Sequence, residues 1–281
     1  MKHFLIYTNY HKDPAGIITE QIRQHLEERG HVCTTVTDRE GFLPVEEHVL
    51  KEAYCMLVLG GDGTMLQAAR DTKQQNIPLI GVNLGTLGYM TEIEPGGLPE
   101  ALDKLIAGEF QTERRMMLNG HVYGTNEEVR EDWALNDIVI SRRGPLQIIK
   151  LNVYVNGQFL NEYSADGVIV TTATGSTGYN LSAGGPIVDP KAQLIMLTPI
   201  CPHTLNARSI ILSPEDVVEI EIPDGREGRA QQLEVNFDGS NVIPVKTGDR
   251  IRIVKSEKDT EIIKINKVSF LEILHKKMSD S

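Results

Sequence analysis

The sequence predicts an α/β N-terminal domain with a Rossmann-like parallel sheet, followed by a C-terminal domain that is rich in β-strands. Two observations lead to this fold class. Over roughly the first hundred residues, short apolar runs alternate with helical patterns, which is typical of a parallel sheet covered by helices. After about residue 113, short apolar stretches follow one another, and turn dipeptides such as Asn156-Gly157 and Asp238-Gly239 separate many of them.

The first domain begins with an apolar strand at residues 3–8. Asp13-Pro14 is a typical helix start and Gly30 a typical helix end, and the apolar residues between them recur at helical spacing. The apolar run before Gly60 is typical of a buried parallel strand. The remaining elements are expected to be strands at residues 32–36, 55–59 and 78–82, and helices at residues 46–52, 65–71 and 98–107.

The second domain contains mainly strands. One helix is expected at residues 176–183, and a last helical turn at 270–276. We place the α/β domain at residues 1–113 and the β-rich domain at 114–265, with 266–281 as a candidate for packing back on the first domain. The strands of the second domain are expected at residues 116–123, 135–141, 148–155, 167–172, 194–198, 217–222, 233–237, 250–254 and 260–265.

Composition excludes several classes of protein. Hydrophobic residues make up 40% of the 281 residues and charged residues 24%, which is typical of a folded globular chain and not of a disordered one. No apolar run approaches the roughly 18 residues of a membrane span, and the N-terminal apolar run is too short for a signal peptide, so a cytoplasmic protein is expected. The net charge of −11 argues against nucleic-acid binding.

Cysteine and histidine patterns predict neither a disulfide framework nor a resident metal. The three cysteines are far apart and form no CxxC motif, and the eight histidines show no metal-ligand spacing. A nucleophile-elbow motif is also absent, because Ser176 stands between Thr-Gly and Thr-Gly. The chemistry of this chain must therefore be sought in its glycine clusters.

The first glycine cluster is GGDGT at residues 60–64, between an apolar strand and a helix. Glycines there let the main chain approach a ligand, and the N–H groups of the first helical turn suit a phosphate, so Gly60, Gly61, Gly63 and Thr64 are a candidate phosphate loop. A carboxylate in such a loop repels phosphate unless it has another task. Asp62 therefore either takes a proton or holds a metal, and the alternative is a helix cap.

Two further polar segments follow predicted strands. The loop at residues 82–89 contains Asn83 and is expected to face the same crevice as the first cluster, because ligands bind beyond the carboxyl ends of adjacent parallel strands. Asn136-Asp137 stands at the head of an apolar strand and is suited to read ribose hydroxyls or a base. A plain strand-to-helix turn and an Asx turn remain the respective alternatives.

The longest cluster covers residues 166–186 and contains the segment TTATGSTGYNLSAGGP at residues 171–186. An apolar strand leads into a stretch rich in Thr, Gly and Ser, which is followed by a short helix and Gly-Gly-Pro. Hydroxyl groups and bare N–H groups at a helix start predict a neutral site for an anion or a sugar edge. The alternative is a flexible solvated loop.

Together these motifs resemble the NAD kinase family over nearly the whole chain. GGDG by itself is weak, since it also occurs in lipid kinases, whereas TGSTGYNLSAGGP is highly specific. The matching segments are GGDGT at 60–64, GVNLGTLGYM at 81–90, NDIVI at 136–140, DGVIVTTATGSTGYNLSAGGPIV at 166–188, PICPHTLNARSIIL at 199–212 and FDG at 237–239.

The resemblance implies transfer of the ATP γ-phosphate to the adenosine 2′-hydroxyl of NAD, with a divalent metal, Mg²⁺, accompanying ATP. It implies a dinucleotide bound between the two domains, a homodimer or homotetramer, and Asp62 as the proton acceptor. The residues expected to contact NAD are Asp62, Gly63, Asn83, Asn136, Asp137, Asp166, Thr177, Gly178, Tyr179, Asn180, Leu181 and Ser182.

Two rival functions remain at this point. A related GGDG lipid or sugar kinase would share the first loop, but no exposed apolar or basic segment suggests a membrane surface. A dinucleotide-binding sensor without activity would share the fold, but it has no need of a base such as Asp62. The roles of Arg142, Arg143 and His203 stay unassigned.

Overall fold

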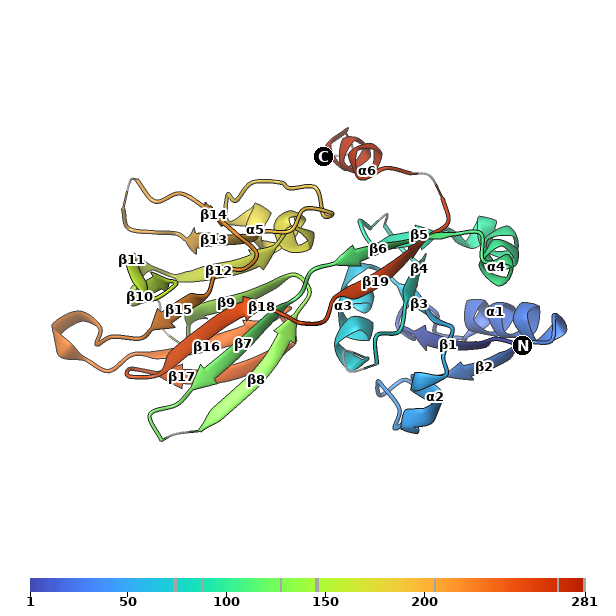
Figure 1. Cartoon of the computed structure of the whole chain (residues 1–281), viewed down its shortest axis with the longest axis horizontal. Helices are drawn as coiled ribbons and strands as arrows, with labels where there is room; N and C mark the ends of the chain where they lie inside the picture. Colours follow the sequence, from blue (N-terminus) through green and yellow to red (C-terminus); the bar gives the residue numbers. More distant parts are fainter. Residues whose placement is uncertain are drawn as a thin grey trace. The chain divides into compact units, whose positions relative to one another are not determined.

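A computed structural model describes residues 1–72, 75–86, 88–126, 128–144, 147–204, 206–266 and 268–279 of the chain (Figure 1). The chain divides into two compact units: residues 1–114 with 260–281 form the first, and residues 115–259 the second. The strand expected at 260–265 therefore lies in the first unit and not in the β-rich one. The apolar pattern predicts a strand but does not predict which sheet it joins. The sheet is set by the long-range pairing of Ile262 with Leu79 of another strand.

The first unit is built on a seven-stranded sheet with the order β2-β1-β3-β4-β19-β6, and β5 pairs with β4. The pairs β1–β2, β1–β3, β3–β4 and β4–β19 are parallel. This confirms the predicted α/β class for the first unit. The strands are β1 (His3–Thr8), β2 (Val32–Thr35), β3 (Cys55–Gly60), β4 (Leu79–Asn83), β5 (Thr91–Ile93), β6 (Gln111–Arg115) and β19 (Thr260–Lys264).

Helices α1 and α4 pack on this sheet because each carries one apolar stripe. Ile22 and Leu26 of α1 and Leu102 and Leu105 of α4 join one core cluster with strand residues such as Leu57. β3 is buried along its whole length, as expected for a central parallel strand. The helices are α1 (Ile17–Glu28), α2 (Glu47–Lys51), α3 (Asp62–Asp71), α4 (Leu98–Ala107), preceded by the 3₁₀ turn η1 (Pro95–Gly97), and α6 (Phe270–Ser279).

Helix α1 begins three residues later than the predicted first helical position. Gly16 adopts φ 66° immediately before Ile17, so the chain turns once before the helix starts. Asp13 still caps it, because its carboxylate accepts the Thr19 N–H at 3.0 Å and the Thr19 hydroxyl at 2.9 Å. None of the helices in the described residues is both long enough and apolar enough to cross a bilayer.

The second unit consists of two six-stranded sheets whose paired strands run antiparallel. Their inner faces share one apolar core that includes Val153 and Ile251 from one sheet and Ile138, Val170 and Phe237 from the other. The first sheet has the order β11 (Gln158–Ala165), β10 (Ile149–Val155), β15 (Val218–Glu221), β18 (Arg250–Lys255), β7 (Leu118–Tyr123), β8 (Val129–Ala134). The second has the order β14 (Ile210–Leu212), β13 (Ile195–Ile200), β12 (Gly167–Thr172), β9 (Asp137–Arg142), β16 (Gln232–Phe237), β17 (Asn241–Lys246).

Little helix interrupts this unit. The helix expected at 176–183 is a 3₁₀ turn, η2 (Thr174–Thr177), followed by one short turn, α5 (Tyr179–Ser182). Gly178 separates the two with φ −93° and ψ −132°, which is not helical. A further 3₁₀ turn, η3 (Arg226–Gly228), lies in the loop after β15.

Candidate functional site

The strand order reverses at β1, since β2 lies on one side of it and β3 on the other. Ligands of open α/β sheets bind beyond the carboxyl ends of the strands at such a reversal. A cavity of about 820 Å³ lies at this place. The loop after β1, including Asn9 and Lys12, and the loop after β3, including Asp62 and Gly63, both line it.

The GGDGT loop is shaped so that the start of α3 stays accessible. A side chain at Gly60 would overlap that of Thr64, whose hydroxyl accepts the Asn9 side-chain amide at 3.2 Å and the Gly61 N–H at 3.4 Å. A Cβ at Gly63 would meet no atom within 4 Å. The first N–H groups of a helix are not bonded within it, so the open side at Gly63 suits an anion.

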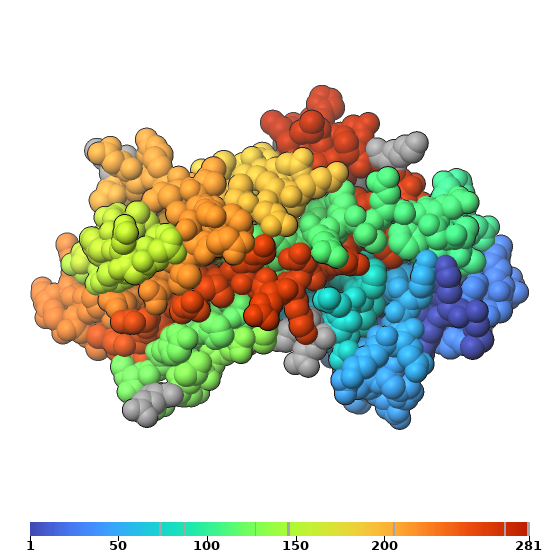
Figure 2. Space-filling view, in the orientation of Figure 1, coloured from blue at the N-terminus to red at the C-terminus, as the bar shows by residue number. Residues whose placement is uncertain are grey.

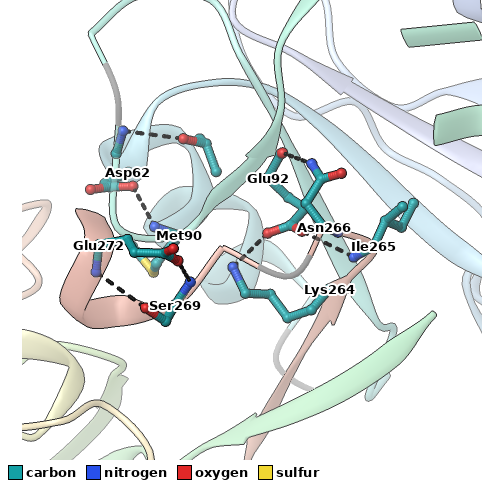
Figure 3. Close-up of polar contacts among 10 residues, drawn as sticks. Asp62, Met90, Glu92, Lys264, Ile265, Asn266, Ser269 and Glu272 are labelled. Carbon is teal, nitrogen blue, oxygen red and sulfur yellow. Dashed lines mark hydrogen bonds and ion pairs between the residues drawn. The ribbon is translucent and has the colours of Figure 1, made fainter. Parts of the chain in front are cut away.

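Asp62 lies at the first position of α3, and another loop orients its carboxylate. The Met90 N–H donates to Oδ1 at 2.9 Å (Figure 3). The Tyr89 N–H donates to Oδ2 at 2.8 Å. Gly60 pairs with Asn83 at the ends of β3 and β4, and the Leu84 N–H donates to the Gly60 carbonyl at 2.8 Å. The two loops that the sequence predicted to share a crevice therefore do so.

Asn83 lies on this crevice side of β4 but has a local task. Its side-chain oxygen accepts the Gly85 N–H at 3.1 Å, which is the Asx turn that the sequence left as an alternative. Asn83 is 7% exposed, so its oxygen mainly shapes the loop. Leu87, in the middle of the predicted motif, lies outside the described residues.

The same cavity is lined by basic side chains, among them Lys12, Arg39 and Lys277. The Lys12 ammonium nitrogen lies 2.9 Å from the position that a Cβ would take at Gly61 and 3.2 Å from that at Gly85. Sequence reasoning missed Lys12. The available signal was its place directly after the first predicted parallel strand, where the sheet rule predicts a ligand.

In the second unit, Asn136 and Asp137 form a turn that Asp238 holds. The Asp238 carboxylate accepts the N–H groups of Leu135 at 2.8 Å, Asn136 at 2.8 Å and Asp137 at 3.1 Å. The Asp238 N–H in turn donates to the Asp137 carbonyl at 3.0 Å. The FDG motif is thus the support of the NDIVI motif, a link over a hundred residues that the sequence did not reveal.

Residues at the end of β12 form hydrogen bonds to the other side of the same turn. The Asn136 carbonyl accepts the Thr172 N–H and the Thr171 hydroxyl, both at 2.9 Å. A Cβ at Gly175 would lie 2.5 Å from that carbonyl oxygen, so glycine is required for this approach. The side-chain oxygen of Asn136 is buried and accepts no hydrogen bond from the described part of the chain. A buried acceptor without a hydrogen bond lowers the stability of the fold, so we expect a donor group of a ligand to bind to this oxygen.

Asp137 is 6% exposed, and its charge state follows from that burial. Burial, and then the charge of Asp238, raises the pKa of Asp137 from 3.8 to about 7. The folded protein therefore holds this proton at pH values where the unfolded chain has released it. The contribution of Asp137 to stability is largest near pH 4 and below, and it is lost as the pH rises toward 7.

We expect Asp137→Asn to abolish this pH dependence. The neutral amide does not ionise, so the variant should be more stable than the parent above pH 7, by up to about 4 kcal/mol for a shift of about three pH units. Urea unfolding of both proteins without ligand between pH 4 and 8 measures the difference. A constant difference across this range would mean that Asp137 ionises at its ordinary pKa.

The turn after β12 separates buried supports from exposed positions. Asn180 is fully buried, its amide donates to the carbonyls of Ser176 at 3.3 Å and Pro186 at 3.1 Å, and its oxygen accepts the Thr198 hydroxyl at 2.7 Å. This side chain therefore supports the turn. Tyr179 and Leu181 are 48% and 41% exposed and are free to meet a ligand.

Asp166 is not brought together with Asn136. It precedes β12, whereas Asn136 contacts Thr172 at the other end of that strand, about 20 Å away at roughly 3.3 Å per residue. Asp166 instead accepts the Arg142 guanidinium at 3.2 Å. Asp166 thus stands apart from the other predicted residues of the second unit, and its contact with NAD stays a prediction.

Within the described ranges, no group of three or more His, Cys, Asp or Glu side chains is placed to hold a metal ion. A magnesium ion that arrives with a nucleotide needs fewer protein ligands, because phosphate oxygens and water fill most of its six positions. The Asp62 carboxylate lines the cavity and fits such an ion as a single oxygen donor.

Comparison with known proteins places both units in one family. Residues 4–110 match the model of the ATP-NAD kinase N-terminal domain, and residues 135–265 match that of the C-terminal domain. The chain is 45% identical to an NAD kinase of Lachnospira eligens, over 99% of this chain and 100% of the relative. It is 47% identical to an NAD kinase of Agathobacter rectalis, over 100% and 99%.

Two solved structures have a similar fold. An NAD kinase from Archaeoglobus fulgidus in complex with ATP is 26% identical, covers 100% of both chains and has a TM-score of 0.78. The yeast NADH kinase complexed with NADH has a TM-score of 0.87 at 23% identity, over 99% of this chain and 88% of the other.

Proposed function

The chain belongs to the NAD kinase family, and from this premise we propose how its residues transfer phosphate from ATP to NAD. The protein is an NAD kinase: it moves the γ-phosphate of ATP to the 2′-hydroxyl of the adenosine ribose of NAD, giving NADP and ADP. One observation carries the residue assignment. Asp62 presents a carboxylate, oriented by two main-chain N–H groups, at the wall of a cavity with basic side chains.

Asp62 is the proton acceptor in this proposal. A ribose hydroxyl is a weak nucleophile at neutral pH, and a positioned carboxylate takes its proton as the bond to phosphorus forms. The two N–H donors hold the carboxylate in place before the substrate arrives, which is the main contribution that phosphoryl transfer requires of a protein. The transferred phosphoryl group goes to the ribose oxygen, and ADP leaves.

The phosphates of ATP lie at the start of α3. Gly60 and Gly61 shape this loop, Gly63 leaves it open, and Thr64 supports it from behind. The Lys12 ammonium supplies positive charge to the same wall. A magnesium ion bound to ATP would neutralise phosphate charge there, and the Asp62 carboxylate would be one oxygen donor for it.

The turn at Asn136 in the second unit supplies contacts to NAD in this proposal. Asn136 offers its free buried acceptor, and Asp137, protonated below about pH 7, offers a donor. In the following turn the exposed residues suit contacts with the dinucleotide, whereas Asn180 acts through the fold of the turn. The residues assigned to NAD are Asp62, Gly63, Asn136, Asp137, Thr177, Gly178, Tyr179, Leu181 and Ser182.

A coupled assay tests the activity directly. The protein, NAD, ATP and magnesium are mixed, and an NADP-specific dehydrogenase reports the product. NADP formation that depends on both substrates supports the proposal. Phosphate transfer to a lipid without NADP would favour the lipid-kinase alternative, and NAD binding without turnover would favour the sensor.

We expect Asn136→Ala to weaken the binding of NAD and to leave the binding of ATP unchanged. Loss of a hydrogen bond to a buried partner costs about 1–3 kcal/mol, so the apparent NAD constant should rise about 10-fold or more. Lys12→Ala is the matched counterpart, because it should raise the ATP constant and leave the NAD constant unchanged. Steady-state kinetics with each substrate varied in turn measures both. Equal effects of one variant on both substrates would contradict the separate assignments.

The protein acts in the cytoplasm, where both substrates are available, and it assembles as a homodimer or homotetramer. Exposed apolar side chains of the β-rich unit support assembly: Phe159 is 59% exposed, Ile211 58% and Val242 49%. These residues lie on three edge strands of the two sheets, β11, β14 and β17, and an unpaired strand edge can join the edge of a second subunit. Light scattering on the purified protein determines the number of subunits.

A further inference from the structure

The catalytic carboxylate depends on a loop that precedes β5. Both Asp62 oxygens accept main-chain N–H groups, from Tyr89 at 2.8 Å and from Met90 at 2.9 Å. Figure 3 shows the Asp62 carboxylate directed at the Met90 amide. Main-chain donors move only when the chain itself moves, so whatever holds Tyr89 also determines where the Asp62 oxygens lie.

The C-terminal helix α6 holds the ring of Tyr89. The Phe270 ring lies 5.8 Å from it, centroid to centroid, at an interplanar angle of 41°. The Lys277 ammonium lies 4.9 Å from the centroid of the same ring. Phe270 and Lys277 are seven residues apart and therefore share one face of the helix, two turns apart. Lys277 also lines the cavity that Asp62 lines.

The start of α6 is fixed by a capping box. The Ser269 N–H donates to the Glu272 carboxylate at 2.6 Å, and the Glu272 N–H donates to the Ser269 hydroxyl at 3.2 Å (Figure 3). These bonds satisfy N–H groups that the helix leaves free. The rest of the helix is largely exposed: Leu271 is 68% and Met278 67% exposed, and Figure 2 shows α6, in red, at the surface. Its hold on Tyr89 is therefore a local contact rather than part of the core.

The chain that leads to α6 is tied to β5 through Glu92. The Glu92 carboxylate is 3% exposed and accepts the Lys264 ammonium at 2.6 Å and the N–H groups of Ile265 at 3.0 Å and Asn266 at 2.5 Å. The Asn266 side chain donates back to the Glu92 carbonyl at 2.8 Å (Figure 3). Glu92 comes two residues after Met90, so the C-terminal segment contacts this strand and its preceding loop at two places.

We propose that residues 264–266 and helix α6 of the C-terminal segment position the catalytic carboxylate, with Phe270 of α6 as a positioning residue that acts on Asp62 through Tyr89. This inference rests on the proposed role of Asp62. The Glu92 bonds fix one end of the 89–92 chain, and α6 fixes the other. Without α6, the two N–H donors and the carboxylate between them would sample more positions, and fewer of these would suit proton transfer.

The test is Phe270→Ala, with Leu271→Ala as the matched control on the outer face of the same helix. Phe270→Ala should lower kcat roughly 10-fold, with the apparent constants of NAD and ATP changed less than twofold. Leu271→Ala should have the kinetics of the parent. Phe270→Tyr keeps a ring beside Tyr89 and should restore most of the rate. A thermal melt of each protein shows that it is folded.

Combination with Asp62→Asn separates this mechanism from a general loss of structure. Residues that act through one another are not additive, so Phe270→Ala should lower the residual rate of Asp62→Asn less than twofold. A full 10-fold further loss in the double variant, or parent-like kcat in Phe270→Ala, would overturn the proposal. If Phe270→Ala does not fold, Phe270→Leu, which keeps an apolar side chain but removes the ring beside Tyr89, is used in the same cycle with the same criteria.

The design also distinguishes failure of this inference from failure of the proposed function. If Asp62→Asn turns over like the parent, the role of Asp62 is wrong and the inference falls with it. If Asp62→Asn is impaired while Phe270→Ala is not, Asp62 keeps its role and the C-terminal segment does not position it.

Discussion

Asp62→Asn is expected to lower kcat by roughly 10²–10⁴-fold while NAD still binds, because general-base catalysis contributes about this much. The amide cannot take the proton of the ribose hydroxyl. It also removes a negative charge beside the phosphates, so nucleotide binding should survive or tighten. Steady-state kinetics from pH 5 to 9 and calorimetric NAD titration measure these effects.

The structure adds a second consequence for this variant. Both oxygens of Asp62 accept main-chain N–H groups, and an amide NH₂ cannot replace either of them as acceptor. One N–H group, of Tyr89 or of Met90, therefore loses its partner, which costs about 1–3 kcal/mol of stability if it stays buried. We expect a lower melting temperature as well as a lower rate. Asp224→Asn is the control, since it makes the same change at an exposed aspartate outside the cavity.

The metal-ligand alternative gives a different result with the same protein. If Asp62 mainly holds magnesium, Asp62→Asn should lose apparent magnesium affinity, and raised magnesium should restore part of the rate. A rate that magnesium does not restore favours the base. Near-normal turnover at ordinary magnesium would contradict both roles and leave Asp62 as a helix cap.

Gly88→Ala is expected to lower kcat about 100-fold or more without altering any polar group, because small displacements of catalytic groups have effects of this size. A Cβ at Gly88 would overlap Asp62 Oδ1 and would lie 2.8 Å from Asp62 Cγ and 2.9 Å from the Thr91 hydroxyl. The carboxylate must therefore move out of its place between the Tyr89 and Met90 N–H groups. Overlap of this kind also destabilises a protein by about 1–3 kcal/mol.

The control for this variant is Gly96→Ala. A Cβ at Gly96 would meet no atom within 4 Å, so both activity and stability should stay close to those of the parent. Kinetics and urea unfolding of the two variants separate a misplaced carboxylate from an unfolded chain. Parent-like kcat in folded Gly88→Ala would show that Asp62 tolerates displacement and would weaken its assignment as the base.

Local patterns were sufficient for much of the fold. The alternation of apolar runs and helical stretches predicted the α/β unit, since a buried parallel strand such as residues 55–60 must be apolar along its length. Turn dipeptides predicted the β-rich unit, with Asn156 adopting φ 51° and Gly157 φ 76° as such a turn requires. The strand at 260–264 pairs with β4 of the first sheet, a partner that its apolar pattern alone does not specify.

The sequence by itself determined the family, the fold class and the loop that carries Asp62, because glycine-rich loops between strands and helices have local sequence signatures. Only the tertiary structure decided what surrounds that carboxylate. Several groups around it come from parts of the chain distant from residue 62. They are the N–H groups of Tyr89 and Met90, the ammonium of Lys12 and the Phe270 ring that packs on Tyr89. Likewise Asp238 supports Asn136 across a hundred residues. Such contacts arise from sheet order and packing, and local spacing does not encode them.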